Sequence, residues 1–302
     1  MMPKGPFDLA HSREFFGGWP SSPDDAKAIV MTFPLEGWQT SAAVVLAQQP
    51  GGRIVGEVHG AGPSAAKAWR QALATLSLDV DGTSYPELGR KDPVIGRLQR
   101  RYALLRPTLF ASPYEAATHF VLSQRRSIAQ ARATRARLAE EHGDAIEVDG
   151  ATFHAFPRPR KLRSLRAVQG VDPERLARLR GIADAALDGR LDRTHLRRLP
   201  VEHALAELRE LRGIGEFFAH GILFRGAGVV DDITADDQLR LAVQRAYRLS
   251  GPPDDDALAK IAERWRPFRM WAEVLLVLQL FREAGRHSLV SRPRGRRRRV
   301  DA

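Results

Sequence analysis

Two glycines and one aspartate are the residues whose types and spacing could do chemistry. Gly213 and Gly215 stand in the segment Leu-Arg-Gly-Ile-Gly, and Asp237 follows 22 residues after the second glycine. Glycine permits backbone conformations that a Cβ would forbid and lets a ligand approach the chain closely. Unpaired amides at the start of a following helix suit a phosphate oxygen. A carboxylate further along could stabilise positive charge that develops on a bound sugar.

A helix on each side must position these glycines. An apolar stripe predicts a helix over 201–211 that leads straight into the turn; it consists of Val201, Leu205, Leu208 and Leu211. A second helix is predicted over 216–225, and Ile214 would fill the gap between the two. A plain turn between helices explains a lone Gly-x-Gly equally well. The stripe and the second helix favour a DNA-binding helix-hairpin-helix over that plain turn.

The aspartate belongs to an acidic loop with the sequence Asp-Asp-Ile-Thr-Ala-Asp-Asp, which spans 231–237 and precedes a helix predicted over 236–248. Carboxylates and hydroxyls are favoured at a helix N-terminus, so Thr234 or one of the acids is expected to cap this helix. Capping explains any one of the four acids taken alone. Only the surrounding pattern distinguishes Asp237.

These residues carry a resemblance to a known family. The stretch from Leu208 to Arg245 resembles the hairpin, glycine-rich loop and aspartate of the endonuclease III-like helix-hairpin-helix DNA glycosylases, most closely those of the bacterial DNA-3-methyladenine glycosylase II type. In that family the essential aspartate is the second of an Asp-Asp pair, the place that Asp237 has here. Further matches are Trp-Arg-Pro-Phe-Arg at 265–269 and Gln-Arg-Arg-Ser at 124–127.

The resemblance implies an enzyme that removes a damaged base from double-stranded DNA. Such an enzyme turns the nucleotide out of the duplex into a pocket. Asp237 would then stabilise the sugar cation and direct a water to it. An alkylated purine is already cationic and needs little protonation to leave, so no cofactor is expected, although relatives bind a monovalent cation at the hairpin turn. Relatives that also cut the DNA backbone carry a lysine where Phe217 stands, so a monofunctional enzyme is expected.

The resemblance assigns DNA contacts to the hairpin and to the loop near residue 125. These residues are Leu211, Gly213, Ile214, Gly215, Gln124, Arg125 and Ser127. Arg125 stands where the family places an intercalating leucine, and a surface charge is the alternative reading. Weaker candidates for phosphate contacts are Arg126, Arg225, Arg240 and Arg269.

The base pocket departs from the family pattern. Phe217 keeps one aromatic position, but Gln238 follows the aspartate where the family often has tyrosine, and Gly221 replaces another aromatic. Phe15 or Phe16 could reach the pocket from the N-terminal region, although core packing explains these phenylalanines as well. The missing aromatics leave two alternatives open: a glycosylase for deaminated or oxidised purines, and a DNA-binding protein on the same scaffold that does not catalyse.

Composition narrows the class of protein. The chain has 302 residues, a formal net charge of +11 and no cysteine. The absence of cysteine excludes an iron–sulfur cluster, a thiolate zinc site and a cysteine nucleophile. The positive charge favours nucleic acid as a partner before an acidic membrane. Six arginines at 292–299 contribute to the excess, and a disordered, solubilising tail explains them equally well.

The chain shows no sign of insertion into or export across a membrane. The opening residues lack an apolar segment of the signal-peptide kind. The apolar run from Trp271 to Phe281 contains Glu273 and Gln279 and is too short to cross a bilayer, so a buried helix is expected there. We therefore expect a cytoplasmic protein, and the resemblance further implies a bacterial, nucleoid-associated enzyme that acts as a monomer.

The pattern of elements predicts an α+β fold. Strands are expected over 28–35, 42–48 and 53–59, with a weaker one over 7–16, and a helix over 64–76 would pack on this antiparallel sheet. Beyond Val94 strand signals almost disappear. Helices are predicted over 113–122, 127–142, 173–187, 201–211, 216–225, 236–248, 255–265 and 268–284. The predicted units are an N-terminal α/β domain (1–105), an all-α glycosylase domain (106–286) and the basic tail (287–302).

Overall fold

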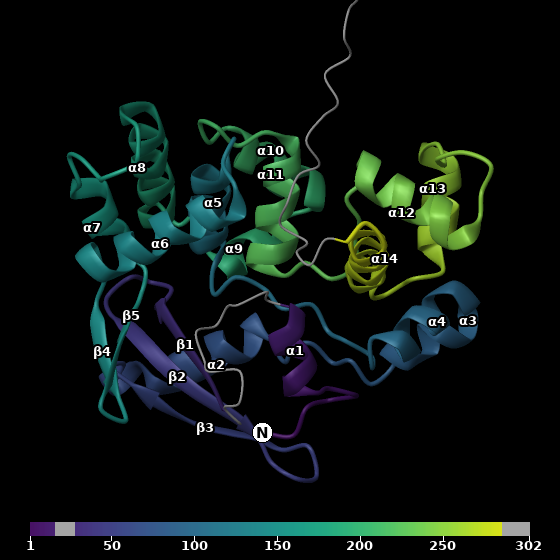
Figure 1. Ribbon diagram of the computed structural model, residues 1–302, viewed down its shortest axis with the longest axis horizontal. Coiled ribbons are helices and arrows are strands. Elements are labelled where there is room, and N and C mark those ends of the chain that lie inside the picture. Colours follow the sequence, from purple (N-terminus) through teal and green to yellow (C-terminus); the bar gives the residue numbers. More distant parts are fainter. Residues whose placement is uncertain (16–27, 286–302) are drawn as a thin grey trace, which may run out of the picture.

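The protein combines a small N-terminal sheet with a larger helical body (Figure 1). The computed structural model describes residues 1–15 and 28–285. Strands β1 (Ala28–Pro34), β2 (Ser41–Gln48) and β3 (Ile54–His59) form an antiparallel sheet in the order β1-β2-β3. Helix α2 (Ala65–Thr75) buries Ala68 and Ala72 in one core with the inward strand residues. The predicted α+β class is confirmed.

The helical body follows the sequence pattern closely. Its helices are α5 (Pro113–Ser123), α6 (Ile128–His142), α7 (Pro159–Ser164), α8 (Pro173–Leu187), α9 (Arg193–Arg198), α10 (Val201–Arg209), α11 (Glu216–Gly221), η3 (a π-helix, Ile222–Ala227), α12 (Asp237–Tyr247), α13 (Asp255–Glu263) and α14 (Arg269–Glu283). Helix α5 begins as its sequence predicts, because the Ser112 hydroxyl accepts a hydrogen bond from the Glu115 amide (3.2 Å) and Pro113 occupies the first turn.

Two predictions about strands are wrong. The segment predicted as a weak strand over 7–16 contains helix α1 (Leu9–Phe15), which the Asp8 carboxylate starts by accepting from the Ala10 amide (2.8 Å). Beyond Val94 the chain forms a second hairpin of β4 (Ala145–Val148) and β5 (Ala151–His154). Its turn residues Asp149 and Gly150 both have positive φ, the geometry of a type I′ turn.

The two predicted domains share side chains across their predicted boundary. The short helices α3 (Leu88–Lys91) and α4 (Pro93–Arg101) precede residue 105, yet Leu88 and Ile95 belong to the core of the helical body. Conversely, Ile146 of β4 packs with Ala43 of β2. The boundary at 105 stays a prediction, and the predicted tail lies outside the described residues.

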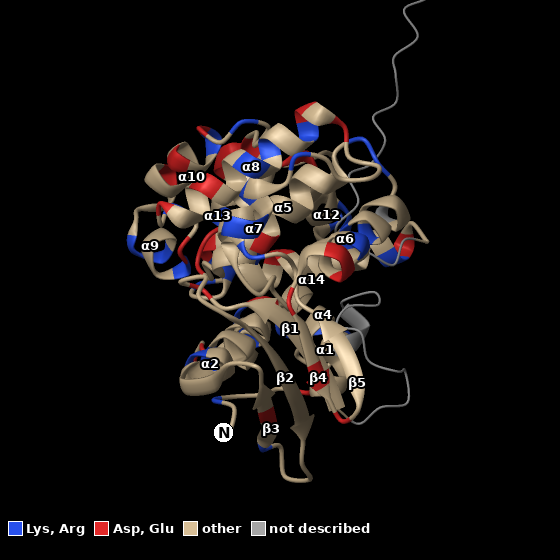
Figure 2. Ribbon diagram, turned by 90° about the vertical axis from the view of Figure 1, so that its left-hand side faces the viewer, with Lys and Arg blue, Asp and Glu red and all other residues tan. Residues whose placement is uncertain are grey.

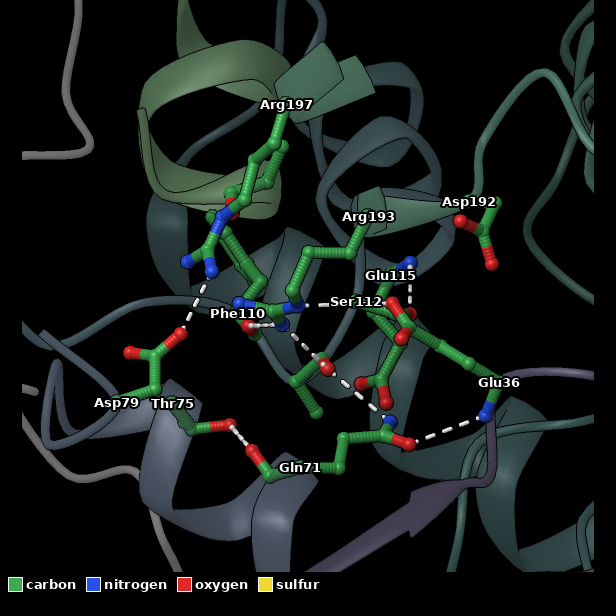
Figure 3. Close-up of polar contacts among 12 residues, drawn as sticks. Glu36, Gln71, Thr75, Asp79, Phe110, Ser112, Glu115, Asp192, Arg193 and Arg197 are labelled. Carbon is green, nitrogen blue, oxygen red and sulfur yellow. Dashed lines mark hydrogen bonds and ion pairs between the residues drawn. The ribbon is translucent and has the colours of Figure 1, made fainter. Parts of the chain in front are cut away.

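A buried polar junction joins the sheet to the helical body (Figure 3). Arg193 of α9 is buried, donates from Nη2 to the carbonyl oxygen of Ala111 (2.8 Å), and places Nε 3.6 Å from Oε1 of Glu36. Gln71 of α2 donates to the carbonyls of Pro34 (3.1 Å) and Ala111 (3.0 Å). Gln71 and Arg193 therefore hold the same carbonyl group, that of Ala111, next to Phe110.

Helix α14 is the buried helix that the apolar run predicts. Trp271, Leu275 and Leu276 are almost fully inaccessible to solvent. In the two described ranges, no helix is both long enough and apolar enough to span a lipid bilayer.

Candidate active site

The predicted hairpin forms between α10 and α11. Helix α10 ends at Arg209, two residues earlier than predicted, and the buried side chains of Leu211 and Ile214 anchor the turn in the core. The Ile214 amide donates to the Leu211 carbonyl (2.9 Å). Gly213 has a φ of +90°, which side-chain-bearing residues rarely adopt. Leu211 and Ile214, predicted among the DNA contacts, therefore support the turn from inside.

The second glycine opens the next helix. Gly215 is the N-cap residue of α11, where no side-chain hydrogen bond caps the helix. A Cβ placed on Gly215 would meet nothing within 4 Å, so the outer side of this turn is open. An uncapped helix start beside open space is the arrangement in which backbone amides hold an anion.

Gln124 ties the neighbouring loop to the hairpin. Its Nε2 donates to the Gly213 carbonyl (2.6 Å), and its Oε1 accepts from Nη1 of Arg178 (2.6 Å). The backbone carbonyl of Gln124 accepts from Nη2 of Arg175 (2.9 Å). The side chain of Gln124, predicted as a DNA contact, thus joins the hairpin turn to α8 through hydrogen bonds within the protein.

Arg125 and Ser127 lie on the loop between α5 and α6. Arg125 is exposed and has a φ of +53°, an uncommon conformation for a residue with a side chain. Ser127 starts α6 through a capping box with Gln130, with bonds of 3.2 Å and 3.0 Å. The loop therefore presents an exposed arginine at its tip, beside the hairpin.

A cavity of about 100 Å³ lies behind the hairpin. Its apolar lining consists of Phe110, Phe120, Phe217, Phe224, Met270, Val274 and Val277. Its polar lining consists of His220, Arg225, Thr234, Asp236, Gln238 and Glu273. Phe217 and Gln238 were both expected in the base pocket, and both line this cavity. The side chains of Phe15 and Phe16 lie outside the described part of the chain.

Phe120 takes the place of the aromatic side chain that Gly221 lacks. A Cβ on Gly221 would lie 2.4 Å from Cζ of Phe120, so the ring packs directly on the glycine backbone. The Phe120 ring also stacks on Phe218, with centroids 5.1 Å apart. The cavity therefore keeps an aromatic wall, but the ring comes from α5.

The π-helix η3 shapes one side of the cavity. It continues α11 and places Phe224 and Arg225 in the lining. The Arg225 carbonyl accepts from the Phe110 amide (2.7 Å), and its Nη2 donates to the Thr108 carbonyl (2.6 Å). Burial lowers the pKa of Arg225 to about 10, which leaves it cationic at neutral pH. Arg225 is thus a cation of the cavity.

The other arginines predicted as phosphate contacts have partners within the protein. Arg269 donates to Oδ1 of Asp231 from Nε (2.8 Å), and Arg240 donates to the Pro253 carbonyl (2.7 Å). Arg126 donates to the Gly170 carbonyl (2.6 Å). These bonds attach the three guanidinium groups to neighbouring loops of the protein. In Figure 2, blue ribbon segments mark lysine and arginine positions on α6, α7 and α8.

The acidic loop places Asp236, and not Asp237, at the cavity. Asp236 is the N-cap of α12, where its Oδ1 accepts from the Leu239 amide (2.8 Å), and it lines the cavity. Asp237 is exposed on the first turn of α12 and is absent from the cavity lining. Burial raises the pKa of Asp236, whereas hydrogen bonds from backbone amides of α12 lower it. The structure thus places Asp236 in the cavity wall and leaves Asp237, the predicted carboxylate, exposed next to it.

The cavity holds a second carboxyl group, Glu273 of α14, which sequence reasoning did not assign to the site. Its Oε2 accepts from the Thr234 amide (2.8 Å), two residues before Asp236. Burial raises the pKa of Glu273 to about 8, and the bond from Thr234 offsets part of that rise. The signal in the sequence was one acid within the long apolar run of α14.

The described residues show no metal centre. Among residues 1–15 and 28–285, no cluster of three or more histidine, aspartate or glutamate side chains is arranged to hold a metal ion.

Comparisons with known proteins agree on the fold. No protein-family model matches the chain. It is 29% identical over 209 residues to DNA-3-methyladenine glycosylase 2 of Escherichia coli (strain K12), covering 67% of this chain and 69% of the relative. It is 26% identical over 206 residues to DNA-3-methyladenine glycosylase of Bacillus subtilis (strain 168), covering 67% and 68%.

Solved structures extend the likeness to nearly the whole chain. The 3-methyladenine DNA-glycosylase from Archaeoglobus fulgidus superposes with a TM-score of 0.71 at 21% identity, over 94% of this chain and 98% of that one. An 8-oxoguanine glycosylase/lyase of Clostridium acetobutylicum, in complex with double-stranded DNA, gives a TM-score of 0.58 at 15% identity, over 85% and 98%. The sheet and the helical body therefore recur together in these proteins.

Proposed function

We propose that this chain is a member of the helix-hairpin-helix superfamily of DNA glycosylases, and that it is a monofunctional base-excision enzyme that removes alkylated purines of the 3-methyladenine type. The single observation that carries the proposal is a cavity with an aromatic lining and the Asp236 carboxylate in its wall, directly behind the hairpin. The names of its two bacterial sequence relatives support the same activity.

The geometry suits a nucleotide turned out of a duplex. The open start of α11 at Gly215 would hold a DNA phosphate, and Arg125 would fill the gap that the extruded nucleotide leaves. The base would then enter the cavity beside Phe217 and Phe120. A cationic methylated base is attracted to the faces of aromatic rings, which favours alkylated purines as substrates.

The Asp236 carboxylate would act on the sugar. As the bond between C1′ and the base nitrogen breaks, its electron pair leaves with the base and positive charge develops on the sugar. A carboxylate at ~4 Å and an effective dielectric constant of ~20 contributes about 4 kcal/mol, or roughly a thousandfold in rate. A water that attacks C1′ then gives its proton to Asp236 and completes an abasic site.

The proposed reaction requires neither a lysine nucleophile, nor a cofactor, nor a second subunit. Phe217 stands where a lyase would need an amine, so no Schiff base forms with the sugar. We propose that catalysis needs no cofactor and that the enzyme acts as a monomer on double-stranded DNA containing damaged bases. A monovalent cation at the hairpin turn would bind through carbonyls other than that of Gly213, which accepts from Gln124.

The deciding experiment compares two adjacent aspartates. Duplexes with a single 7-methylguanine are incubated with excess enzyme, and abasic sites are revealed with hot alkali. We expect Asp236→Asn to lower the single-turnover rate by about a thousandfold, because the variant loses the charge that faces the sugar. Asp237→Asn, the matched control, is expected to stay within about threefold of wild type, because its carboxylate is exposed outside the cavity.

Four results would contradict the proposal. A large loss in Asp237→Asn with an active Asp236→Asn would return the role to the residue that the sequence pattern names. Equal strand breakage by both variants and wild type would mean that neither carboxylate acts, and no breakage by any of the three would mean that the protein only binds DNA. A covalent adduct trapped by borohydride would exclude the monofunctional mechanism.

A further inference from the structure

The position of Glu273 in the cavity is not explained by the removal of cationic bases. One carboxylate near the sugar suffices for a leaving group that already carries a positive charge. Glu273 comes from α14, on a different element from Asp236, and it lines the same cavity. The two carboxyl groups are joined through a short segment, since the Thr234 amide donates to Glu273 and the Thr234 carbonyl accepts from the Asp236 amide (2.7 Å).

Anchoring the Thr234 amide does not by itself require an acid at this position. Oε2 of Glu273 accepts one hydrogen bond from the Thr234 amide, and a glutamine amide oxygen would accept that bond as well. An ionisable carboxyl in a largely apolar cavity costs more than an amide, because its charged form loses hydration. A carboxyl group differs from an amide in one relevant respect: it can give up a proton.

The charged and titratable groups around Glu273 come from three helices and from the loop that precedes α12. Asp236 at the start of α12 and Asp232 in the preceding loop oppose its ionisation, and burial opposes it most strongly. Arg225 of η3 and His220 of α11 also line the cavity. Arg225 is attracted to the ionised form of Glu273, so it would stabilise the carboxylate left after a proton has been given away.

Building on the proposed function, we propose that Glu273 donates a proton to the departing base and so allows this enzyme to remove purines that carry no positive charge. A neutral purine is a poor leaving group, since its departure as an anion is costly. A carboxylic acid within the cavity can protonate a ring nitrogen as the glycosidic bond breaks. Glu273 is the acid and Asp236 the base of one site.

The proton balance of this step closes within the cavity. The C1′–N9 bond breaks, its electron pair moves into the purine, and the Glu273 proton passes to a ring nitrogen of the base. Water then forms a bond to C1′ and transfers its proton to Asp236. The products are a neutral free base and an abasic sugar. Transfer of one proton from Asp236 back to Glu273 restores the starting state.

The test compares two lesions in otherwise identical duplexes, 7-methylguanine as the cationic base and hypoxanthine as the neutral one. Glu273→Gln keeps the acceptor for the Thr234 amide and removes the proton. We expect it to lower single-turnover excision of hypoxanthine by about 100-fold and of 7-methylguanine by no more than about threefold. The control is Glu283→Gln, an exposed acid on the same helix, which should match wild type on both lesions.

The pH profile gives a second readout that a structural role would not move. Wild-type excision of hypoxanthine should fall about tenfold per pH unit above pH ~8, while excision of 7-methylguanine stays level across that range. The Gln variant should lack this fall. Equal losses on both lesions, or no excision of hypoxanthine by the wild type, would overturn the role of Glu273. Failure of the wild type on 7-methylguanine would instead overturn the proposed function itself.

Discussion

Two carboxyl groups in one cavity differ because their local partners differ. Burial raises the pKa of both Asp236 and Glu273. Asp236 sits at the start of a helix, where backbone amides of Leu239 and Gln238 favour its ionised form. Glu273 lies within α14, so it has no such helix start and receives a single amide from Thr234. One carboxyl group can therefore be protonated while the other is ionised at the same pH, which is how sites for general acid–base catalysis are commonly built.

The raised pKa of Glu273 has a consequence for stability. In the unfolded chain this carboxyl ionises near pH 4.5, but in the folded protein near pH 8. Between these values the folded state binds an extra proton, so stability falls as pH rises from 4.5 to 8. Between pH 5 and 8 the wild type should lose on the order of 2–4 kcal/mol of its free energy of unfolding through this group. Glu273→Gln has no carboxyl group to titrate at this position, so we expect it not to show this loss.

Thermal melts at half-unit steps from pH 5 to pH 8.5 measure this difference, with Glu283→Gln as the control. The wild-type melting temperature should decline more steeply than that of Glu273→Gln, and the control should follow the wild type. Parallel curves for all three proteins would mean that Glu273 is ionised in the folded state at neutral pH.

At the scale of single residues, the sequence locates the acidic loop but does not show which of its carboxylates lines the cavity. Four acids within seven residues leave the choice open, because the local helix start decides which carboxylate turns inward. Spacing alone favours Asp237, whereas the N-cap geometry of α12 turns Asp236 toward the cavity. Glu273 could be suspected as the one acid in an apolar run, but its proximity to Thr234 depends on the tertiary fold.

At the scale of elements, the hairpin uses its two glycines differently. Gly213 needs its positive φ of +90°, and a Cβ there would lie 2.7 Å from Cδ of Arg178. Gly215 has an ordinary φ of −90° and open space around its Cα. The first glycine therefore serves the fold of the turn, and the second leaves room for a ligand outside it.

This division predicts opposite phenotypes for two alanine substitutions. Gly213→Ala should lower the free energy of unfolding by about 1–2 kcal/mol, the cost of holding a side-chain-bearing residue at positive φ. Gly215→Ala should leave stability within about 0.5 kcal/mol of wild type, yet weaken DNA binding, since its methyl group would project where a phosphate approaches. Urea denaturation and fluorescence anisotropy with a labelled duplex measure the two effects. A destabilised Gly215→Ala with unchanged affinity would refute this assignment.

The sequence predicts the helices of the body well because capping residues and apolar stripes are local signals. Ser112 and Pro113 mark the start of α5, and the stripe of α10 ends near the hairpin, as the structure confirms. The β4–β5 hairpin was missed because its strands are short, although Asp149-Gly150 is a turn signal. The π-helix η3 has no comparable local signal in the sequence.

At the scale of the whole molecule, the junction around Arg193 couples the sheet to the helical body. Arg193 and Glu36 are both largely withdrawn from solvent, and burial raises the pKa of Glu36 and lowers that of Arg193. Removing one partner of such a pair strands the other in a medium that disfavours charge. A single substitution in this pair should therefore cost more folding stability than replacement of both residues together.

A double-mutant cycle tests this coupling. Arg193→Met should lower the free energy of unfolding by about 3 kcal/mol, because it strands Glu36 and removes donors to two backbone carbonyls. Adding Glu36→Gln to that variant should restore about 1 kcal/mol or more, since no buried charge then lacks its counterion. Strictly additive effects in chemical denaturation would show that the two side chains are not coupled.

The order of sheet and helices follows from local pattern, but their mutual packing does not. The sequence predicts a boundary at residue 105, whereas Leu88 and Ile95 lie in the core of the helical body. Trp38, from the N-terminal sheet region, donates to the Ala186 carbonyl of α8 (2.9 Å). These contacts join residues far apart in the chain, so no local periodicity could reveal them.

Phe110 links the shape of the cavity to elements that do not line it. Its ring lines the cavity, its amide donates to the Arg225 carbonyl, and its own carbonyl accepts from Arg193 (3.3 Å). Substitutions in β1, α2 or α9 would therefore shift the Phe110 ring slightly and change which bases fit the cavity. Substrate range can therefore depend on residues outside the cavity lining, in the sheet and in the helices that hold Phe110.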